Sequence, residues 1–304
     1  MRRFAPAAVS LRIGTYNVLD GGRDEGGLYV RWAAQTSMLD QLSLDVLCIQ
    51  GANHWDRKGS ARAKGTAKTL GMTARLARSR SGGHLVILAR EPKVRITRFY
   101  PDIVENRYQQ KPFHHTVSRA DLQIEGVEWP LRLLHAHLSP ISPEDRAREA
   151  AWLTEYGDQP DTVLIGDLSC EAPDDPQPKS WDWLAPHLHS LHRIRHADGT
   201  YGDGDRGAMQ ALVDAGFQDP AALPGIERHR TVGYWDPTQL HDRRSDYILP
   251  TCRLLSTRAE LRSYDVVDIE TTRQLSSHLP VVAKLAVRRT LPLAARRRLQ
   301  RYPA

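Results

Sequence analysis

The chain has 304 residues, of which 26 % are charged and 40 % hydrophobic, the balance of an ordinary soluble globular protein. Lys and Arg number 42 against 36 Asp and Glu, a net charge of +6. This excess suits a polyanionic partner such as nucleic acid or a phosphorylated metabolite, and it equally fits an Arg-rich composition alone. No apolar run approaches the roughly 20 residues of a membrane helix, and the N-terminus lacks the apolar stretch of a signal peptide. We therefore expect a cytoplasmic protein with no membrane partner.

Short apolar runs between turn residues predict strands along the whole chain. We expect them at residues 11–16, 45–50, 84–89, 94–99, 116–124, 131–137, 162–166, 246–249, 264–269 and 281–287.

Helices are fewer. Apolar spacing predicts one at 32–42, Ser142 followed by a proline marks the start of a second, and a third at 206–215 ends before Gly216. The cation-rich stretch 57–80 is the better candidate for a phosphate-facing loop, and 289–304 is expected to be a basic tail.

The order of these elements bears on the fold class. Strands dominate and helices do not alternate with them strictly, which argues against a doubly wound parallel sheet. The pattern favours two mixed β-sheets packed face to face with helices outside, a four-layer α/β/β/α sandwich. We expect one domain over residues 9–288. The three cysteines have neither metal-site nor disulfide spacing, so we expect small buried side chains.

Polar residues stand where the expected strands begin or end. Asn17, His137 and Asp167 follow strands, Asp246 begins one, and His278 comes shortly before the last. If these ends converge, they form a cleft with two imidazoles, two carboxylates and an amide. Such a cluster suits an oxygen-liking cation such as Mg²⁺.

These positions lie in six ordered segments. They read Thr15-Tyr16-Asn17-Val18-Leu19, Cys48-Ile49-Gln50-Gly51, His137-Leu138, Gly166-Asp167-Leu168-Ser169, Ser245-Asp246-Tyr247-Ile248 and Ser276-Ser277-His278. Together they resemble, in order and spacing, the endonuclease/exonuclease/phosphatase family, whose fold is DNase-I-like. The resemblance runs from about residue 11 to residue 287, nearly the whole chain.

The resemblance implies an active site. It assigns catalytic roles to Asn17, His137, Asp167, Asp246 and His278, with His278 as the general base that activates water. It assigns Asn17 and Asp246 as metal ligands, with Mg²⁺ or Mn²⁺ as the ion. The implied substrate is a nucleic acid or a small phosphoester.

Three positions depart from the family pattern. Gly51 stands where the family has a metal-binding Glu, Ser169 where it has an Asn, and Ser277 where an Asp precedes the terminal His. In that order, the departures remove a metal ligand, an amide and a charge that supports the base. Losing even a supporting partner of a metal site typically lowers metal affinity or activity about 10–100-fold. The acids that follow the strand ends are candidates to replace the missing carboxylate: Asp20, Asp24, Asp56, Glu171, Asp174 and Asp175.

Three functions follow from this pattern. The first is a divalent-metal-dependent phosphohydrolase, a weakened phosphodiesterase or nuclease that cleaves a P–O bond by in-line water attack. The second is a pseudoenzyme of the same fold that acts as a binding module. The third is a repurposed pocket in which His137 and His278 perform metal-independent acid–base chemistry on a small molecule. Core packing is the expected role of Tyr234 and Trp235, although either ring would stack on a base, and His114 and His115 are given no role.

Overall fold

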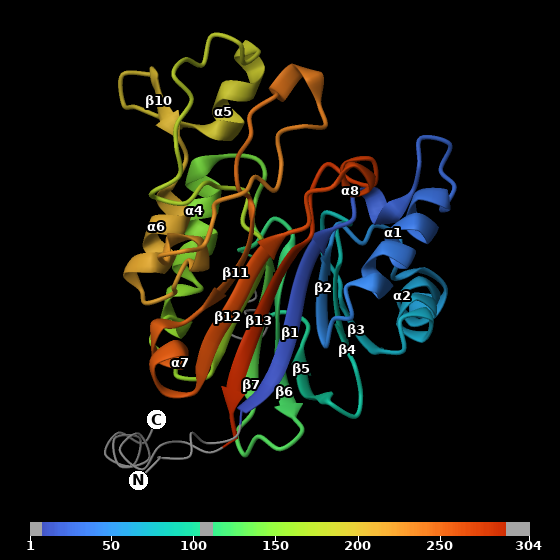
Figure 1. The fold of residues 1–304 in the computed structure, drawn as a ribbon. Helices are drawn as coiled ribbons and strands as arrows, with labels where there is room; N and C mark the ends of the chain where they lie inside the picture. The colour runs from blue at the N-terminus through green and yellow to red at the C-terminus, as the bar shows by residue number, and fades with distance from the viewer. Residues whose placement is uncertain (1–7, 104–111, 290–304) are drawn as a thin grey trace.

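The structure is a computed structural model that describes residues 8–103 and 112–289. Two β-sheets pack face to face in the middle of the molecule, with helices on either side of the pair (Figure 1). The expected basic tail lies outside the described residues from position 290 on. The bounds predicted for the domain, 9–288, stay a prediction, and the described strands run from Ala8 to Arg288.

The first sheet has six strands in the order β12-β13-β1-β2-β4-β3. Its central strand β1 pairs in antiparallel with β13 and in parallel with β2. The strands are β1 (Ala8–Asn17), β2 (Val46–Gln50), β3 (Thr73–Ala77), β4 (Leu85–Ala89), β12 (Ala259–Val266) and β13 (Val281–Arg288).

The second sheet has five strands in the order β11-β8-β7-β6-β5. Its parallel pair is β7 with β8, and β11 joins β8 in antiparallel. The strands are β5 (Val94–Tyr100), β6 (Thr116–Ile124), β7 (Leu131–His137), β8 (Thr162–Asp167) and β11 (Asp246–Pro250). A separate hairpin is formed by β9 (Arg193–Arg195) and β10 (Tyr201–Gly204).

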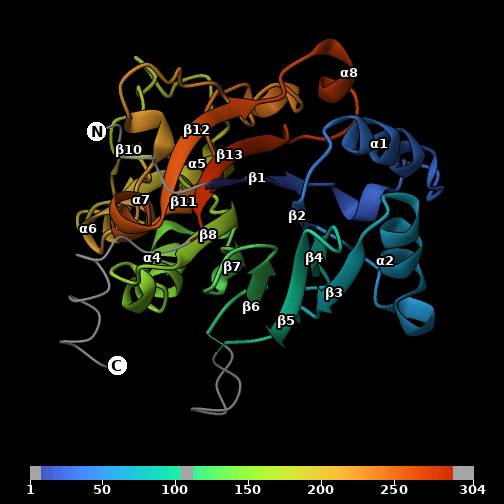
Figure 2. The ribbon, with the colours of Figure 1, turned by 60° about the horizontal axis from the view of Figure 1, so that its bottom comes forward.

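Three apolar clusters define four layers. The largest lies between the sheets and joins residues such as Ile13 and Ile87 of the first sheet to Leu133 and Ile165 of the second. Helices α1 (Val30–Gln41) and α2 (Arg57–Thr69) pack on the outer face of the first sheet. Helices α4 (Pro143–Ala151) and α6 (Gly207–Asp214) pack on the outer face of the second (Figure 2). The expected α/β/β/α sandwich is confirmed.

The remaining helices are short. They are η1 (Asp20–Gly22), η2 (Thr154–Tyr156), η3 (Pro186–Leu188), α5 (His189–His192), η4 (Pro220–Ala222), η5 (Pro237–Gln239), α7 (Cys252–Thr257) and α8 (Glu270–Arg273). No helix in the described ranges is both long and apolar enough to cross a membrane.

Local signals explain the helices that were expected. The Ser142 hydroxyl accepts a hydrogen bond from the Asp145 amide at 3.2 Å and so caps α4. Gly216, with φ +110°, follows the end of α6, a backbone conformation that favours glycine.

Residues 57–80 do not form the expected phosphate-facing loop, because α2 and β3 occupy most of this stretch. Helix α2 buries only small side chains, Ala63, Thr66 and Ala67, so it lacks the large apolar stripe that marks a helix in sequence. Strand β12 runs from Ala259 to Val266, so it begins five residues before the expected strand and ends three residues before it. Its first half has only one buried residue, Ala259, among exposed and half-buried ones, and so lacks the apolar run that marks a strand in sequence.

Candidate active site

The strand ends converge as the sequence predicted. His137 is paired with Asp167 across β7 and β8, and Asp246 is paired with Asp167 across β8 and β11. Asn17, His137, Asp167 and His278 line one cleft of about 350 Å³, while the side chain of Asp246 is fully buried behind it. All five predicted site residues thus gather at one edge of the two sheets.

His278 is held by Asp246. The Nδ1 atom of His278 lies 2.9 Å from Asp246 Oδ2, and its Nε2 lies 3.7 Å from Asp167 Oδ2. Burial would lower the pKa of His278, but the Asp246 and Asp167 carboxylates outweigh it and raise that pKa to about 9. Burial raises the pKa of Asp246. The pair is therefore a buried imidazole oriented by a buried carboxyl group, with the second ring nitrogen directed to Asp167.

Asp167 accepts hydrogen bonds from several side-chain and backbone groups of the cleft. Its Oδ1 accepts hydrogen bonds from Ser245 Oγ at 2.6 Å and from the Ser169 amide at 2.9 Å. Its Oδ2 accepts one from Asn17 Nδ2 at 3.0 Å. Burial opposes ionisation, but His278 and His137 together with these donors hold the pKa of Asp167 well below its usual range. Asp167 is therefore an ionised carboxylate that positions Asn17 within the cleft.

His137 differs from His278 in charge. Its Nε2 lies 3.4 Å from Asp167 Oδ2, and its ring stacks on His115 with 3.8 Å between centroids. Burial lowers the pKa of His137 to about 4. Ser81 Oγ lies 2.5 Å from His115 Nδ1. His137 is thus neutral at pH 7, so the two cleft histidines are suited to different proton-transfer roles.

A side chain at Gly51 would meet Asn17 in its present position. This glycine has φ +62°, and a Cβ built on it would lie 2.5 Å from Asn17 Oδ1. The Asn17 oxygen also accepts a hydrogen bond from the Leu19 amide at 3.2 Å. The amide of Asn17 therefore occupies the space into which a side chain at position 51 would extend.

The six candidate replacement acids do not fill this gap. Within the described ranges, the only cluster of acidic, His or Cys side chains with metal-site spacing is Asp167, Asp246 and His278. The six candidates have partners elsewhere: Asp20 with Asn53, Asp24 with the Leu28 amide, Asp56 with His84, Glu171 with His241, Asp174 with Arg228 and Asp175 with Arg244. The cleft thus keeps only the carboxylates that the family pattern retained.

Several solved structures are similar to this one. No family model matches the sequence, and none of the curated proteins matches it. An endonuclease/exonuclease/phosphatase family protein from Bacteroides thetaiotaomicron is similar with a TM-score of 0.62 at 14 % identity, covering 92 % of this chain and 98 % of that one. The mannosyl-6-phosphatase Bt3783 of that bacterium gives 0.61 at 14 %, covering 91 % and 99 %. TDP2 of D. rerio, complexed with a single-strand DNA product, gives 0.60 at 15 %, covering 91 % and 99 %.

The chain has the endonuclease/exonuclease/phosphatase fold. The resemblance drawn from six short sequence segments is confirmed at the level of the fold, over nearly the whole length of both chains. An identity of 14–15 % leaves the chemistry to be argued from the site itself.

The family that the six sequence segments resemble uses a divalent metal ion, and three side chains of the site have the spacing to hold one. Asp167, Asp246 and His278 each offer one ligand atom, and these atoms lie within 4.8 Å of one another. Asp246 Oδ1 is buried without a hydrogen-bond partner in the described part of the chain. Carboxylate oxygens are the donors that Mg²⁺ and Mn²⁺ favour. These three donors fit a divalent ion, and Gly51 contributes no side-chain ligand.

Sequence reasoning missed several cleft residues. Ser245 donates to Asp167, His115 stacks on His137, and Arg243 lines the cleft wall. The expectation of core packing for Trp235 is wrong, because its side chain is 39 % exposed and lines the cleft. Tyr234 is half-buried and donates a hydrogen bond to the Ser276 carbonyl at 2.7 Å. Among the expected buried cysteines, Cys48 and Cys170 are buried and Cys252 is exposed.

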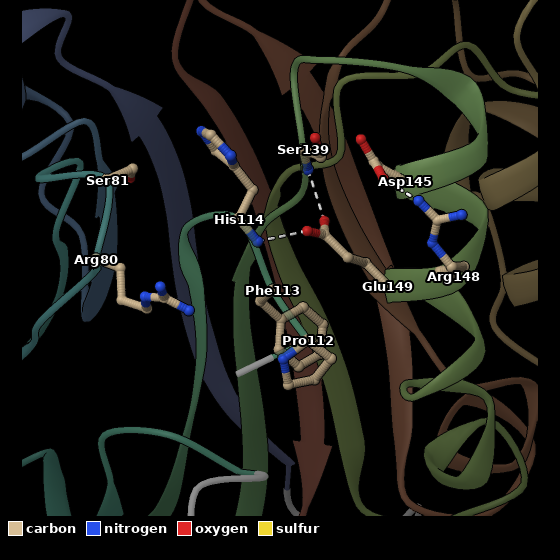
Figure 3. Close-up of a pocket in the computed structure, with 9 residues that line it drawn as sticks. All are labelled: Arg80, Ser81, Pro112, Phe113, His114, Ser139, Asp145, Arg148 and Glu149. Carbon is tan, nitrogen blue, oxygen red and sulfur yellow. Dashed lines mark hydrogen bonds and ion pairs between the residues drawn. The ribbon is translucent and has the colours of Figure 1, made fainter. Parts of the chain in front are cut away.

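Glu149 lines a second pocket, together with Phe113, His114 and Ser139 (Figure 3). It reaches from α4 and accepts hydrogen bonds from the His114 and Ser139 amides, each at 2.6 Å (Figure 3). Those amides precede β6 and follow β7, so one carboxyl group ties together the segments that carry His115 and His137. Burial raises the pKa of Glu149 to about 7.

Proposed function

We propose that this protein hydrolyses a phosphoester bond in the cleft lined by Asn17, His137, Asp167 and His278. The observation that carries the proposal is the His278–Asp246 pair, with 2.9 Å between Nδ1 and Oδ2. An imidazole whose other nitrogen is held by a carboxyl group is the arrangement that proton transfer to and from an attacking nucleophile requires. The fold supports the reaction class, because similar structures include a mannosyl-6-phosphatase and TDP2 with a DNA product.

The chain's own residues support an in-line attack by water. Such an attack needs a group that accepts the water proton as the bond to phosphorus forms. In its neutral form His278 can accept that proton on Nε2, because Nδ1 is engaged by Asp246. With a pKa of about 9, the neutral form gains population as the pH rises above neutral. The positive charge that His278 then carries is balanced by Asp246 and by Asp167, whose Oδ2 lies 3.7 Å from Nε2. Asp167 also holds the amide of Asn17 at the same place.

A divalent ion, Mg²⁺ or Mn²⁺, is part of the proposal. Asp246 and Asn17, which the family pattern assigns as ligands, would hold it together with Asp167. When bound, such an ion supplies positive charge to the phosphoryl oxygens. The substrate class is nucleic acid or a small phosphoester.

The proposal is tested with purified protein against plasmid DNA, RNA, a chromogenic phosphodiester and a chromogenic phosphomonoester. Each substrate is assayed with Mg²⁺, with Mn²⁺ and with a chelator. We expect turnover of at least one substrate that is lost in His278→Ala and in Asp167→Ala. If the unmodified protein is no faster than these two variants on every substrate, the proposed function is wrong.

A second candidate is a binding module of the same fold. It is favoured by the space at Gly51, which the Asn17 amide already occupies, and by the serines at positions 169 and 277. Calorimetric binding of a phosphate-bearing ligand without turnover under any of the metal conditions would support this candidate and exclude hydrolysis of that ligand.

A further inference from the structure

Arg243 occupies a defined place on the wall of the cleft. Its main chain forms an antiparallel bridge with Val232, and the Thr231 amide donates to the Arg243 carbonyl at 2.9 Å. Arg243 lines the same cleft as Asp167 and His278. It also borders a neighbouring, strongly charged pocket of about 420 Å³.

The guanidinium of Arg243 lacks the acidic partner that its neighbours have. In the described residues no carboxylate lies within 4.0 Å of it, and its Nη1 donates a hydrogen bond to the His241 carbonyl at 3.2 Å. The other arginines of the cleft and of the neighbouring pocket are all paired: Arg146 with Asp205 at 2.7 Å, Arg228 with Asp174 at 3.9 Å, Arg230 with Asp242 at 2.6 Å and Arg244 with Asp175 at 2.7 Å. Arg243 therefore retains donors for a further acceptor.

The surroundings make an unpaired cation costly at this position. Arg243 is half-buried, and burial lowers its pKa although the more distant carboxylates of Glu171, Asp167 and Asp246 act in the opposite direction. The charged form therefore retains a desolvation penalty that no direct ion pair offsets. An anion that enters the cleft would offset this penalty, because it would supply the missing partner. Arg243 also lowers the pKa of His278 electrostatically, which indicates that the two cationic groups act on the same part of the cleft.

We propose that Arg243 binds the phosphoryl oxygens of the substrate, so that the cleft contains a built anion site formed by the guanidinium beside His278. A guanidinium presents a planar fork of donors that matches phosphate oxygens in pairs. It adds positive charge to a cleft to which position 51 contributes no metal ligand. The proposal rests on the proposed function for its substrate class, and its binding step is measurable without turnover.

The test uses inorganic phosphate as the probe in a chelator-containing buffer, with binding measured by calorimetry. The variants are Arg243→Ala and Arg243→Lys, with Arg228→Ala as the matched control, since Arg228 borders only the neighbouring pocket and is ion-paired. We expect phosphate affinity to fall about 10- to 100-fold in Arg243→Ala. It should fall less in Arg243→Lys, which keeps the charge without the fork, and stay unchanged in Arg228→Ala. Equal thermal unfolding midpoints confirm that each variant is folded.

The outcomes separate this inference from the proposed function. If phosphate binding depends on Arg243 but the protein hydrolyses no phosphoester, the anion site is supported and the proposed hydrolysis is wrong. If the protein hydrolyses a phosphoester and both Arg243 variants have unchanged kcat and KM, the assignment of Arg243 is wrong and the proposed hydrolysis stands. If the unmodified protein binds no phosphate, or if Arg243→Ala binds it as tightly as Arg228→Ala does, the assignment of Arg243 is wrong.

Discussion

The side chain of Asn17 stands against the backbone of Gly51, so that a Cβ at position 51 would lie 2.5 Å from Asn17 Oδ1. Because of this contact, a Glu side chain at position 51 would require Asn17 to move. The amide that the family pattern places beside the metal-binding Glu here closes the space that the Glu side chain would use. The groups that remain in the cleft for the proposed metal and substrate chemistry are therefore Asn17, Asp167, Asp246 and His278.

Restoring the family residue at position 51 should fail. We expect Gly51→Glu to lose about 1–3 kcal/mol of unfolding free energy, because a side chain is strained at φ +62° and displaces Asn17. Phosphoesterase activity should not rise. Denaturant unfolding and a chromogenic phosphodiester assay check both statements, with Gly51→Ala reporting the backbone strain and the Cβ contact with Asn17 without a carboxylate. A gain in activity for Gly51→Glu would show that the position accepts a carboxylate after all.

Replacing Asp246 should change His278 without removing it. In Asp246→Asn the pKa of His278 should fall from about 9, because the Asp246 carboxylate is the largest charge that raises it against burial. Activity should drop about 10- to 100-fold, the usual cost of losing a group that orients a functional side chain. The imidazole is titrated by NMR in a chelator, and Ser277→Ala is the control. An unchanged His278 titration would mean that Asp246 does not act on the imidazole.

Glu149 should make stability depend on pH. Burial raises its pKa from 4.5 in the unfolded chain to about 7 in the folded protein. The unfolded state therefore releases its proton first, so this residue's contribution to the unfolding free energy falls as pH rises from 4.5 to 7 and is constant above that range. The total fall is up to roughly 3 kcal/mol.

The measurement compares the unfolding free energy of the native protein with that of Glu149→Gln at several pH values. The Gln variant carries a constant cost from one mismatched amide contact, so only the pH-dependent difference between the two proteins counts. That difference should move in favour of Glu149→Gln between pH 4.5 and 7. A difference that stays flat across this range would show that Glu149 ionises normally in the folded state.

Much of the fold was predictable because its strands are buried on one or both faces. Strands such as β2 and β4 are buried at every position, and their short apolar runs stand out in the sequence. Helix α2 was not predictable in this way, because its buried face is made of Ala63, Thr66 and Ala67 and its first turn contains left-handed residues. Its Arg and Lys residues instead suggested a loop.

The site shows the same division. Asn17, Asp167 and His278 were found because they end or precede strong strands in a recognisable order. Arg243 gave no such signal, because its proposed role depends on the lack of an acid beside its guanidinium among the described residues, which only the packing of distant segments determines. Trp235 was assigned to the core because an aromatic residue near a strand usually packs inward, but the loop that carries it faces the cleft.

The central claim is that the His278–Asp246 pair performs phosphoester hydrolysis in this cleft. The most direct measurement is kcat/KM for a chromogenic phosphodiester with Mn²⁺, for the native protein, His278→Gln and the cleft control Ser277→Ala. General acid–base catalysis typically contributes about 10²–10⁴-fold, so we expect His278→Gln to lose activity in that range while Ser277→Ala stays within a few-fold. Equal kcat/KM for the native protein and a folded His278→Gln would contradict the account.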